Sequence, residues 1–165
     1  MKPAVITDIK KYYPANAIYE LRKVKTALAC VQSGAPRLSE LKKQVGEDKV
    51  LTLIEIWILD TNEFFNVNNK MSPVQIHQTA LMLMQDFYYF NIADINYLFT
   101  QAKKGRYGEL YGSIDGMKIF SWFEKHDIER SEVGYFNKLQ EHDIEMQNEK
   151  NAKSLRKNRI GKKDE

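Results

Sequence analysis

The sequence predicts an all-α protein, a single compact bundle of five to seven helices followed by a basic, partly disordered C-terminal tail. Apolar residues recur at three- and four-residue spacing in most of the chain. Helix start signals precede several of these patterns. The one run that could be a strand, VLTLIEIWIL, has no partner strand elsewhere. Because 165 residues suffice for one sizeable core, we expect a helical domain over residues 1–145 and a basic tail over residues 146–165.

The N-terminal half contains two long apolar patterns separated by a short helical segment, Leu38–Val45. The first pattern ends where Gly34 supplies a helix stop. The second, EDKVLTLIEIWILDTNEFF, begins with Glu47 and Asp48, whose charges suit the positive end of a helix. Its apolar face continues past the central run as far as Phe64, and this continuation favours a helix over a buried strand.

The C-terminal half has the clearer start signals. Ser72 can cap a helix, and Gln75 three residues later can complete a capping box. Asn91 and Asp94 repeat this arrangement before the next helix, which Gly105 ends. Together the patterns predict core helices over residues 16–32, 48–65, 73–87, 92–104 and 116–139.

Cysteine usage and hydropathy indicate the compartment. Cys30 is the single cysteine, so no internal disulfide can form, and its apolar neighbours predict a buried thiol. The first residues do not resemble a signal peptide, and the longest apolar run is far shorter than the roughly 20 residues that span a bilayer. These observations predict a cytoplasmic protein that does not associate with membranes.

Positive charge is concentrated at the C-terminus. Residues 150–163 carry seven Lys or Arg and no acid, whereas residues 1–149 hold 18 cations and 20 anions. Such a segment can attract phosphates without regard to sequence, here through Arg156, Lys157 and Arg159. A tail that only aids solubility would have the same composition, and both interpretations stay open.

The stretch KKGRYGELYGSIDG, residues 103–116, combines four glycines with cations and tyrosines. Positive charge beside aromatic rings suits single-stranded nucleic acid. The spacing is not that of a P-loop, and no strand precedes it. The alternative is a helix end at Gly105 followed by a connector whose tyrosines pack inward. The candidate contacts here are Lys103, Lys104, Arg106, Tyr107 and Tyr111.

Histidine can serve as a metal ligand or an acid–base group. The tetrapeptide HDIE occurs twice, beginning at His126 and His142. Sixteen residues at about 100° each place the copies about 160° apart around one helix, so they cannot share a metal. We therefore expect solvated pairs at both copies. No catalytic motif is present, and the sequence favours a non-enzymatic protein without cofactor or metal. An enzyme whose site is assembled from distant residues, such as a carboxylate pair in a cleft, stays open as a third interpretation.

Two segments carry a family resemblance: SPVQIHQTALMLMQDFYYFNIADINYLFTQA and KKGRYGELYGSIDGMKIFSWFEKHDIER. Over residues 72–130 the chain resembles a largely uncharacterised family of small helical proteins encoded by bacterial phages and mobile genetic elements. The shared pattern is a capped helix, an aromatic junction, GxYGxLY, Asp-Gly and an aromatic helix that contains Trp122. The resemblance implies a setting of DNA replication or transfer, an architecture similar to phage helicase-loader domains, and Lys104 as a phosphate contact.

The sequence thus predicts an accessory protein that binds nucleic acid weakly, with single strands the better fit, or that binds a DNA-replication protein. The expected contacts are the five residues of the glycine-rich stretch together with Arg156, Lys157 and Arg159. The alternative is a protein-interaction adaptor or inhibitor without nucleic-acid affinity. Its contacts would be exposed aromatic residues such as Tyr88, Tyr89 and Tyr97. The sequence makes no prediction about oligomeric state.

Overall fold

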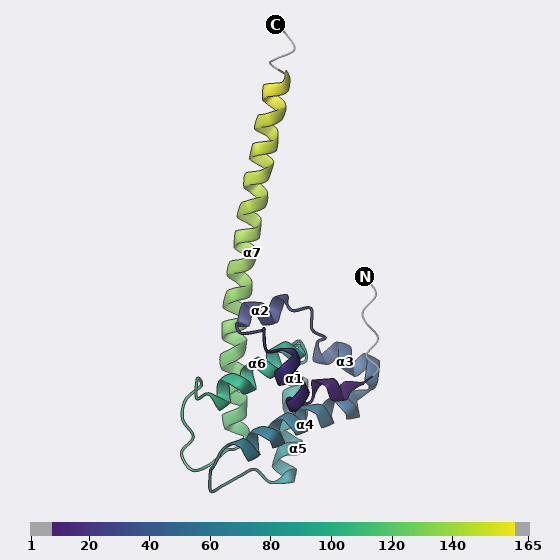
Figure 1. The fold of residues 1–165 in the computed structure, drawn as a ribbon, viewed down its shortest axis with the longest axis vertical. Helices are drawn as coiled ribbons and strands as arrows, with labels where there is room; N and C mark the ends of the chain where they lie inside the picture. The colour runs from purple at the N-terminus through teal and green to yellow at the C-terminus, as the bar shows by residue number, and fades with distance from the viewer. Residues whose placement is uncertain (1–7, 161–165) are drawn as a thin grey trace. The chain divides into compact units, whose positions relative to one another are not determined.

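A computed structural model describes the backbone of residues 8–160 and the side chains of residues 8–157. Every element in that range is helical, and the predicted all-α class is confirmed (Figure 1). The chain divides into two units, Met1–Arg130 and Ser131–Glu165. The elements are a 3-10 helix, η1 (Ile9–Tyr12), and the α-helices α1 (Pro14–Glu20), α2 (Ala27–Gln32), α3 (Leu38–Val45), α4 (Glu47–Phe64), α5 (Pro73–Asp86), α6 (Ile92–Lys103) and α7 (Gly116–Ile160).

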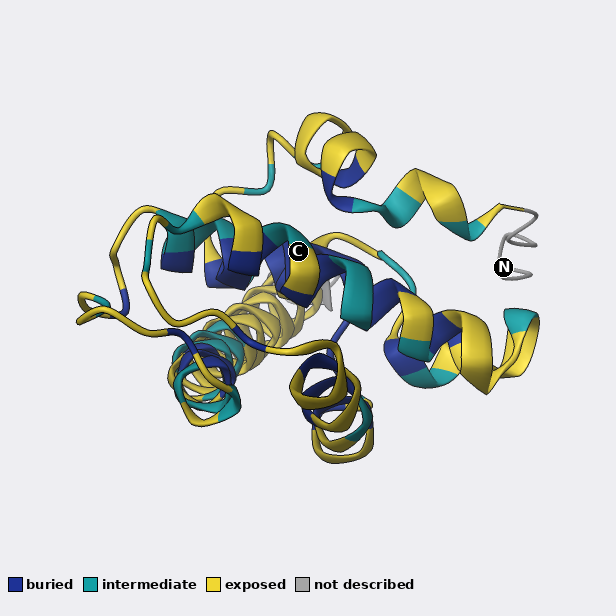
Figure 2. Cartoon of the chain, turned by 90° about the horizontal axis from the view of Figure 1, so that it is seen from below, coloured by how far each residue is buried: buried dark blue, intermediate teal, exposed yellow. Residues whose placement is uncertain are grey.

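The core of the first unit is built around α4, which packs against α3, α5 and α6, while α2 packs against α6. Figure 2 shows the buried residues on the inward faces of these helices. Trp57 of α4 stacks on Phe99 of α6 with ring centroids 5.6 Å apart, and Phe90 stacks on Phe123 of α7 at 5.7 Å. All four rings are fully buried, and each contributes about 2–3 kcal/mol by leaving water.

The predicted capping boxes are confirmed. The Ser72 backbone N–H donates to the Gln75 side chain at 2.8 Å, and the Gln75 N–H donates back to the Ser72 hydroxyl at 3.3 Å. Asn91 and Asp94 exchange the same two hydrogen bonds, each 2.9 Å long. These bonds fix the starts of α5 and α6 because they satisfy backbone donors that lack a partner within the helix.

The predicted single helix over residues 16–32 is wrong. The structure has α1, a turn and α2, and the Thr26 hydroxyl accepts the Ala29 N–H at 3.1 Å to begin α2. A continuous helix would have relied on an apolar face that includes Ile18 and Val31, yet both side chains are exposed. The local cap at Thr26 therefore decides where α2 begins, although the apolar spacing would allow one continuous helix. The resulting turn places Arg22 beside α6.

Helix α7 covers the predicted helix over residues 116–139 and continues to Ile160. The described part of the predicted tail is therefore helical, and residues 161–165 lie outside the described range. The Asp115 carboxylate accepts the Lys118 N–H at 2.9 Å at the start of α7. Among the described helices, none is both long enough and apolar enough to cross a membrane.

Candidate functional site

The three cations of the glycine-rich stretch have different surroundings. Lys103 forms an ion pair with Asp60, so its charge is locally compensated. Lys104 and Arg106 are exposed on either side of Gly105, whose φ of 73° lies in the left-handed region that glycine adopts at low cost. Of the three cations in this stretch, Lys104 and Arg106 are therefore the two whose charge is more available to a ligand.

The two tyrosines of the glycine-rich stretch differ in exposure to solvent. Tyr111 is 87% exposed, whereas Tyr107 is 8% exposed and belongs to the main hydrophobic core. Burial raises the pKa of the Tyr107 hydroxyl, and Lys125 donates to the Tyr107 carbonyl at 2.8 Å. The prediction that both rings offer a stacking surface is wrong for Tyr107, because its ring is buried in the hydrophobic core. For this residue the connector interpretation is correct.

The predicted tail contacts belong to the second unit. Arg156 and Lys157 are exposed side chains on α7. The Arg159 backbone is helical, and its side chain lies outside the described residues. Contact of these side chains with phosphates stays a prediction.

A basic groove of about 340 Å³ lies between the turn that joins α1 to α2 and one face of α6. Its cations are Arg22 and Lys25 from the turn and Lys104 from the end of α6, and no acid is among the described residues that line it. Arg22 donates to the Tyr19 carbonyl at 2.7 Å, and its guanidinium lies over the Tyr19 ring at 4.2 Å. The volume falls within the range of small-ligand sites.

The inner wall of the basic groove contains an unpaired acceptor. Asn96 is 5% exposed, and its Oδ1 has no hydrogen-bond partner in the structure. A buried polar atom without a partner costs about 1–3 kcal/mol. The groove therefore offers positive charge for an anion, while the Asn96 Oδ1 is closed off from solvent.

Tyr97 also lines the basic groove, and its hydroxyl donates to the Glu129 carboxylate at 3.3 Å. Burial raises the pKa of Tyr97 to about 12, the Glu129 charge adds to the shift, and the Arg106 charge opposes it. Of the glycine-rich stretch, Lys104 is the residue that lines the groove.

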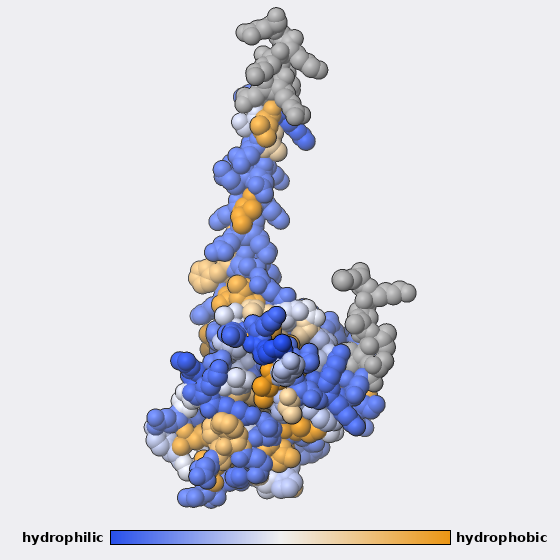
Figure 3. All heavy atoms as spheres, in the orientation of Figure 1, coloured by the Kyte–Doolittle hydropathy of each residue, from blue (hydrophilic) through white to orange (hydrophobic). Residues whose placement is uncertain are grey.

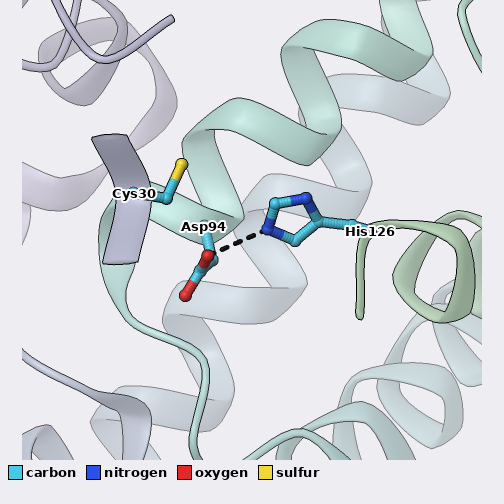
Figure 4. A group of neighbouring side chains, drawn as sticks. All are labelled: Cys30, Asp94 and His126. Carbon is cyan, nitrogen blue, oxygen red and sulfur yellow. Dashed lines mark hydrogen bonds and ion pairs between the residues drawn. The ribbon is translucent and has the colours of Figure 1, made fainter. Parts of the chain in front are cut away.

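A second candidate is a buried cluster formed by Cys30 of α2, Asp94 of α6 and His126 of α7. Figure 4 shows the three side chains converging from their separate helices. His126 Nε2 lies 2.9 Å from Asp94 Oδ1, and both side chains are fully buried. Because an ionised carboxylate only accepts, Nε2 is the donor. Arg130 Nε donates to both Asp94 oxygens, at 3.2 and 3.1 Å.

The three side chains carry donor atoms of the kinds that bind metal ions. A thiolate, a carboxylate and an imidazole are ligands that zinc takes, and their ligand atoms lie within 4.8 Å of one another. However, the Asp94 oxygens already accept from the Asn91 N–H, His126 and Arg130, and the guanidinium compensates the carboxylate charge. Burial and the nearby Asp94 charge raise the pKa of the Cys30 thiol, which disfavours the thiolate. The contacts fit a structural junction better than a metal site.

The expectation that both HDIE copies are solvated pairs is wrong for the first copy. His126 is fully buried, whereas His142 is exposed. One signal in the sequence distinguishes them. His126 follows Ile119 by seven residues and Trp122 by four, and therefore lies on the apolar face of α7. The residue four positions before His142 is instead Lys138.

The aromatic residues named for the adaptor alternative also differ in exposure. Tyr88 is exposed, Tyr89 is half-buried and Tyr97 is buried. Tyr97 is therefore not available as an exposed anchor, because it packs with Ala93 of its own helix and with Cys30 of α2.

Comparisons of the chain with protein-family models, with curated proteins and with solved structures found no match.

Proposed function

We propose that this chain is a non-enzymatic accessory protein that binds single-stranded nucleic acid, with the phosphates placed at the basic groove. The observation that carries this proposal is the lining of the groove, where Arg22, Lys25 and Lys104 meet without an acid among the described lining residues. Phosphate contacts by such cations release counterions and supply sequence-independent affinity.

The exposed ring of Tyr111 supports single strands as the ligand. An unpaired base can stack on an aromatic ring, whereas the bases of a duplex are already stacked on one another.

The proposal keeps some residues that the sequence predicted and changes the role of others. Lys104 and Arg106 remain contacts, and Tyr111 remains an exposed ring on which a base can stack. Lys103 is compensated by Asp60 and is therefore a weaker contact. Arg156, Lys157 and Arg159 would add affinity that depends on salt rather than on sequence.

The groove is tested with the double variant Lys25→Glu/Lys104→Glu and a labelled single-stranded oligonucleotide. We expect its affinity to fall at least tenfold, because two phosphate contacts become repulsive. The slope of log K against log salt concentration should become shallower by about 1.4, at roughly 0.7 per lost contact on a single strand. Fluorescence anisotropy at several salt concentrations measures both quantities.

The matched control is Lys43→Glu/Lys49→Glu, which makes the same change in net charge at exposed positions on α3 and α4. This control should bind nearly as well as the unchanged chain. A chain that ends at residue 149 separates the tail from the groove. Equal losses in both double variants would contradict the groove as the binding site, and no binding by the unchanged chain would contradict the function itself.

A protein partner is the second candidate function, and one observation favours it. Tyr111 and Met117 are 87% and 84% exposed, and with Leu110 they line one shallow surface pocket. Tyr and Met are enriched in protein interfaces. A DNA-replication protein is the partner class that the family resemblance implies. Met117→Ser should abolish such binding while nucleic-acid affinity changes little.

The setting proposed for both functions is the bacterial cytoplasm, in the replication or transfer of phage or mobile-element DNA. The family resemblance over residues 72–130 suggests the process. The buried free thiol of Cys30 suits a reducing compartment.

A further inference from the structure

A second cavity, of about 710 Å³, is formed by η1 and α1. Two of its lining residues are Tyr12 and Tyr19, and we call it the tyrosine cavity. Leu21 lines both this cavity and the basic groove, so the two are adjacent. Figure 3 shows apolar and hydrophilic side chains side by side on the face that carries α1.

The charges of the tyrosine cavity differ from those of the basic groove. Two cations, Lys10 and Lys11, line it together with two acids, Asp8 and Glu20, so the formal charges cancel. The basic groove instead has three cations and no acid among its described lining residues. Phosphate is therefore attracted to the groove, and the tyrosine cavity suits an uncharged ring.

The ring of Tyr19 is held in place before any ligand binds. The Arg22 guanidinium lies over this ring at 4.2 Å, and the same side chain donates to the Tyr19 carbonyl at 2.7 Å. Tyr19 is 64% exposed, so its ring remains accessible although the guanidinium covers part of it. A ring that is already ordered loses little side-chain entropy when a ligand stacks on it.

Tyr12 forms a wall of the cavity that is fixed to the core. Its backbone carbonyl accepts a hydrogen bond from Trp57 Nε1 at 3.0 Å, and Trp57 is fully buried on α4. Lys11 Nζ lies 4.9 Å from the centroid of the Tyr12 ring. The cavity thus has one anchored and one exposed tyrosine, each beside a cation, which is the combination that single-stranded nucleic acid uses.

From this adjacency, the balanced charge and the exposed ring, we propose that the tyrosine cavity binds a base of the strand whose phosphates lie in the basic groove. The base stacks on Tyr19. Arg22 serves both parts of the site, because it lines the groove and supports the Tyr19 ring. The inference rests on the proposed function and adds a base-binding site to it. Since every base has a π-face, the stack accepts all four bases.

The variant Tyr19→Ser tests the stack in the full chain with a labelled single-stranded oligonucleotide. We expect its affinity to fall by about fivefold or more, as for the loss of one base–aromatic contact. The slope of log K against log salt concentration should stay unchanged, because no phosphate contact is lost and the backbone carbonyl that accepts from Arg22 is retained. Fluorescence anisotropy at several salt concentrations measures both quantities.

Three further variants separate stacking from other effects. Tyr19→Phe keeps the ring and should bind nearly as well as the unchanged chain, whereas Tyr19→Leu keeps apolar surface without a ring and should bind as weakly as Tyr19→Ser. The matched control is Tyr135→Ser, which removes a 62% exposed tyrosine from α7 and should not lower the affinity. Equal losses in Tyr19→Ser and Tyr135→Ser would overturn the inference.

An abasic oligonucleotide of the same length shows whether the base is what Tyr19 contacts. The unchanged chain and Tyr19→Ser should bind this strand equally, because it has no base to stack. The same loss on the abasic strand as on the ordinary one would overturn the inference. If the unchanged chain binds the ordinary strand and Tyr19→Ser binds it equally well, the base-binding site is wrong while the proposed function stands. No binding by the unchanged chain contradicts both.

Discussion

Replacing His126 with alanine is expected to lower the free energy of unfolding by about 3 kcal/mol, whereas His142→Ala should leave it unchanged. His126 is a fully buried ring that packs against Phe90 and Tyr97, at centroid distances of 5.4 and 5.3 Å. Its loss leaves a cavity and removes one donor from the buried carboxylate of Asp94. Urea unfolding followed by tryptophan fluorescence measures the change.

The comparison is well controlled because both histidines begin the same tetrapeptide on the same helix. His142 is exposed, so its truncation leaves no cavity. His126→Phe, which fills the space without donating to Asp94, separates the two contributions and should lie between the alanine variant and the unchanged chain. If His126→Ala unfolds at the same urea concentration as His142→Ala, the buried junction has no structural role.

Gly116→Ala is expected to destabilise the first unit by about 2 kcal/mol. A Cβ at this position would lie 2.6 Å from the hydroxyl oxygen of Thr79, and Thr79 is itself buried on α5. Because the Cβ and Cγ2 atoms of Thr79 also lie within 3.7 Å of the added Cβ, a simple rotation of the side chain gives limited relief. Thermal unfolding monitored by tryptophan fluorescence provides the measurement.

Gly134→Ala is the paired control for this substitution and should have the opposite sign. No atom lies within 4 Å of a Cβ at Gly134, and the residue is within α7. Alanine should therefore stabilise the helix locally, by up to about 1 kcal/mol. Increased helical content by far-ultraviolet circular dichroism is the expected readout. A stabilised Gly116→Ala chain would show that α5 and α7 do not approach as closely as the structure indicates.

Much of the fold could be predicted from the sequence because its signals are local. The capping boxes at Ser72 and Asn91 need only residues three positions apart, and both occur as expected. The division of the predicted helix over residues 16–32 depends on a competition between the Thr26 cap and tertiary packing. Apolar spacing alone cannot rank these two effects, and the turn that they create supplies Arg22 and Lys25 to the basic groove.

The candidate site was less predictable because its residues are distant in the chain. Lys104 was identified from the glycine-rich stretch, but the cations that join it come from the turn between α1 and α2. Tyr107 and Tyr111 have similar sequence surroundings, yet the ring of Tyr107 is buried in the core and the ring of Tyr111 is exposed to solvent. Asp94 was correctly identified as a capping residue, while its contacts to His126 and Arg130 require the placement of α7.

The capping box at Asn91 and Asp94 differs from an ordinary helix start in one further respect. The Asn91 amide side chain donates to the Cys30 carbonyl at 2.9 Å, and the Ile92 N–H donates to the Pro36 carbonyl at 3.1 Å. Helix ends usually fray on their own, as small local openings that cost little. Here the end of α6 cannot open without breaking contacts to α2 and α7 as well. Fraying at this helix end is therefore coupled to the cooperative opening of the whole first unit.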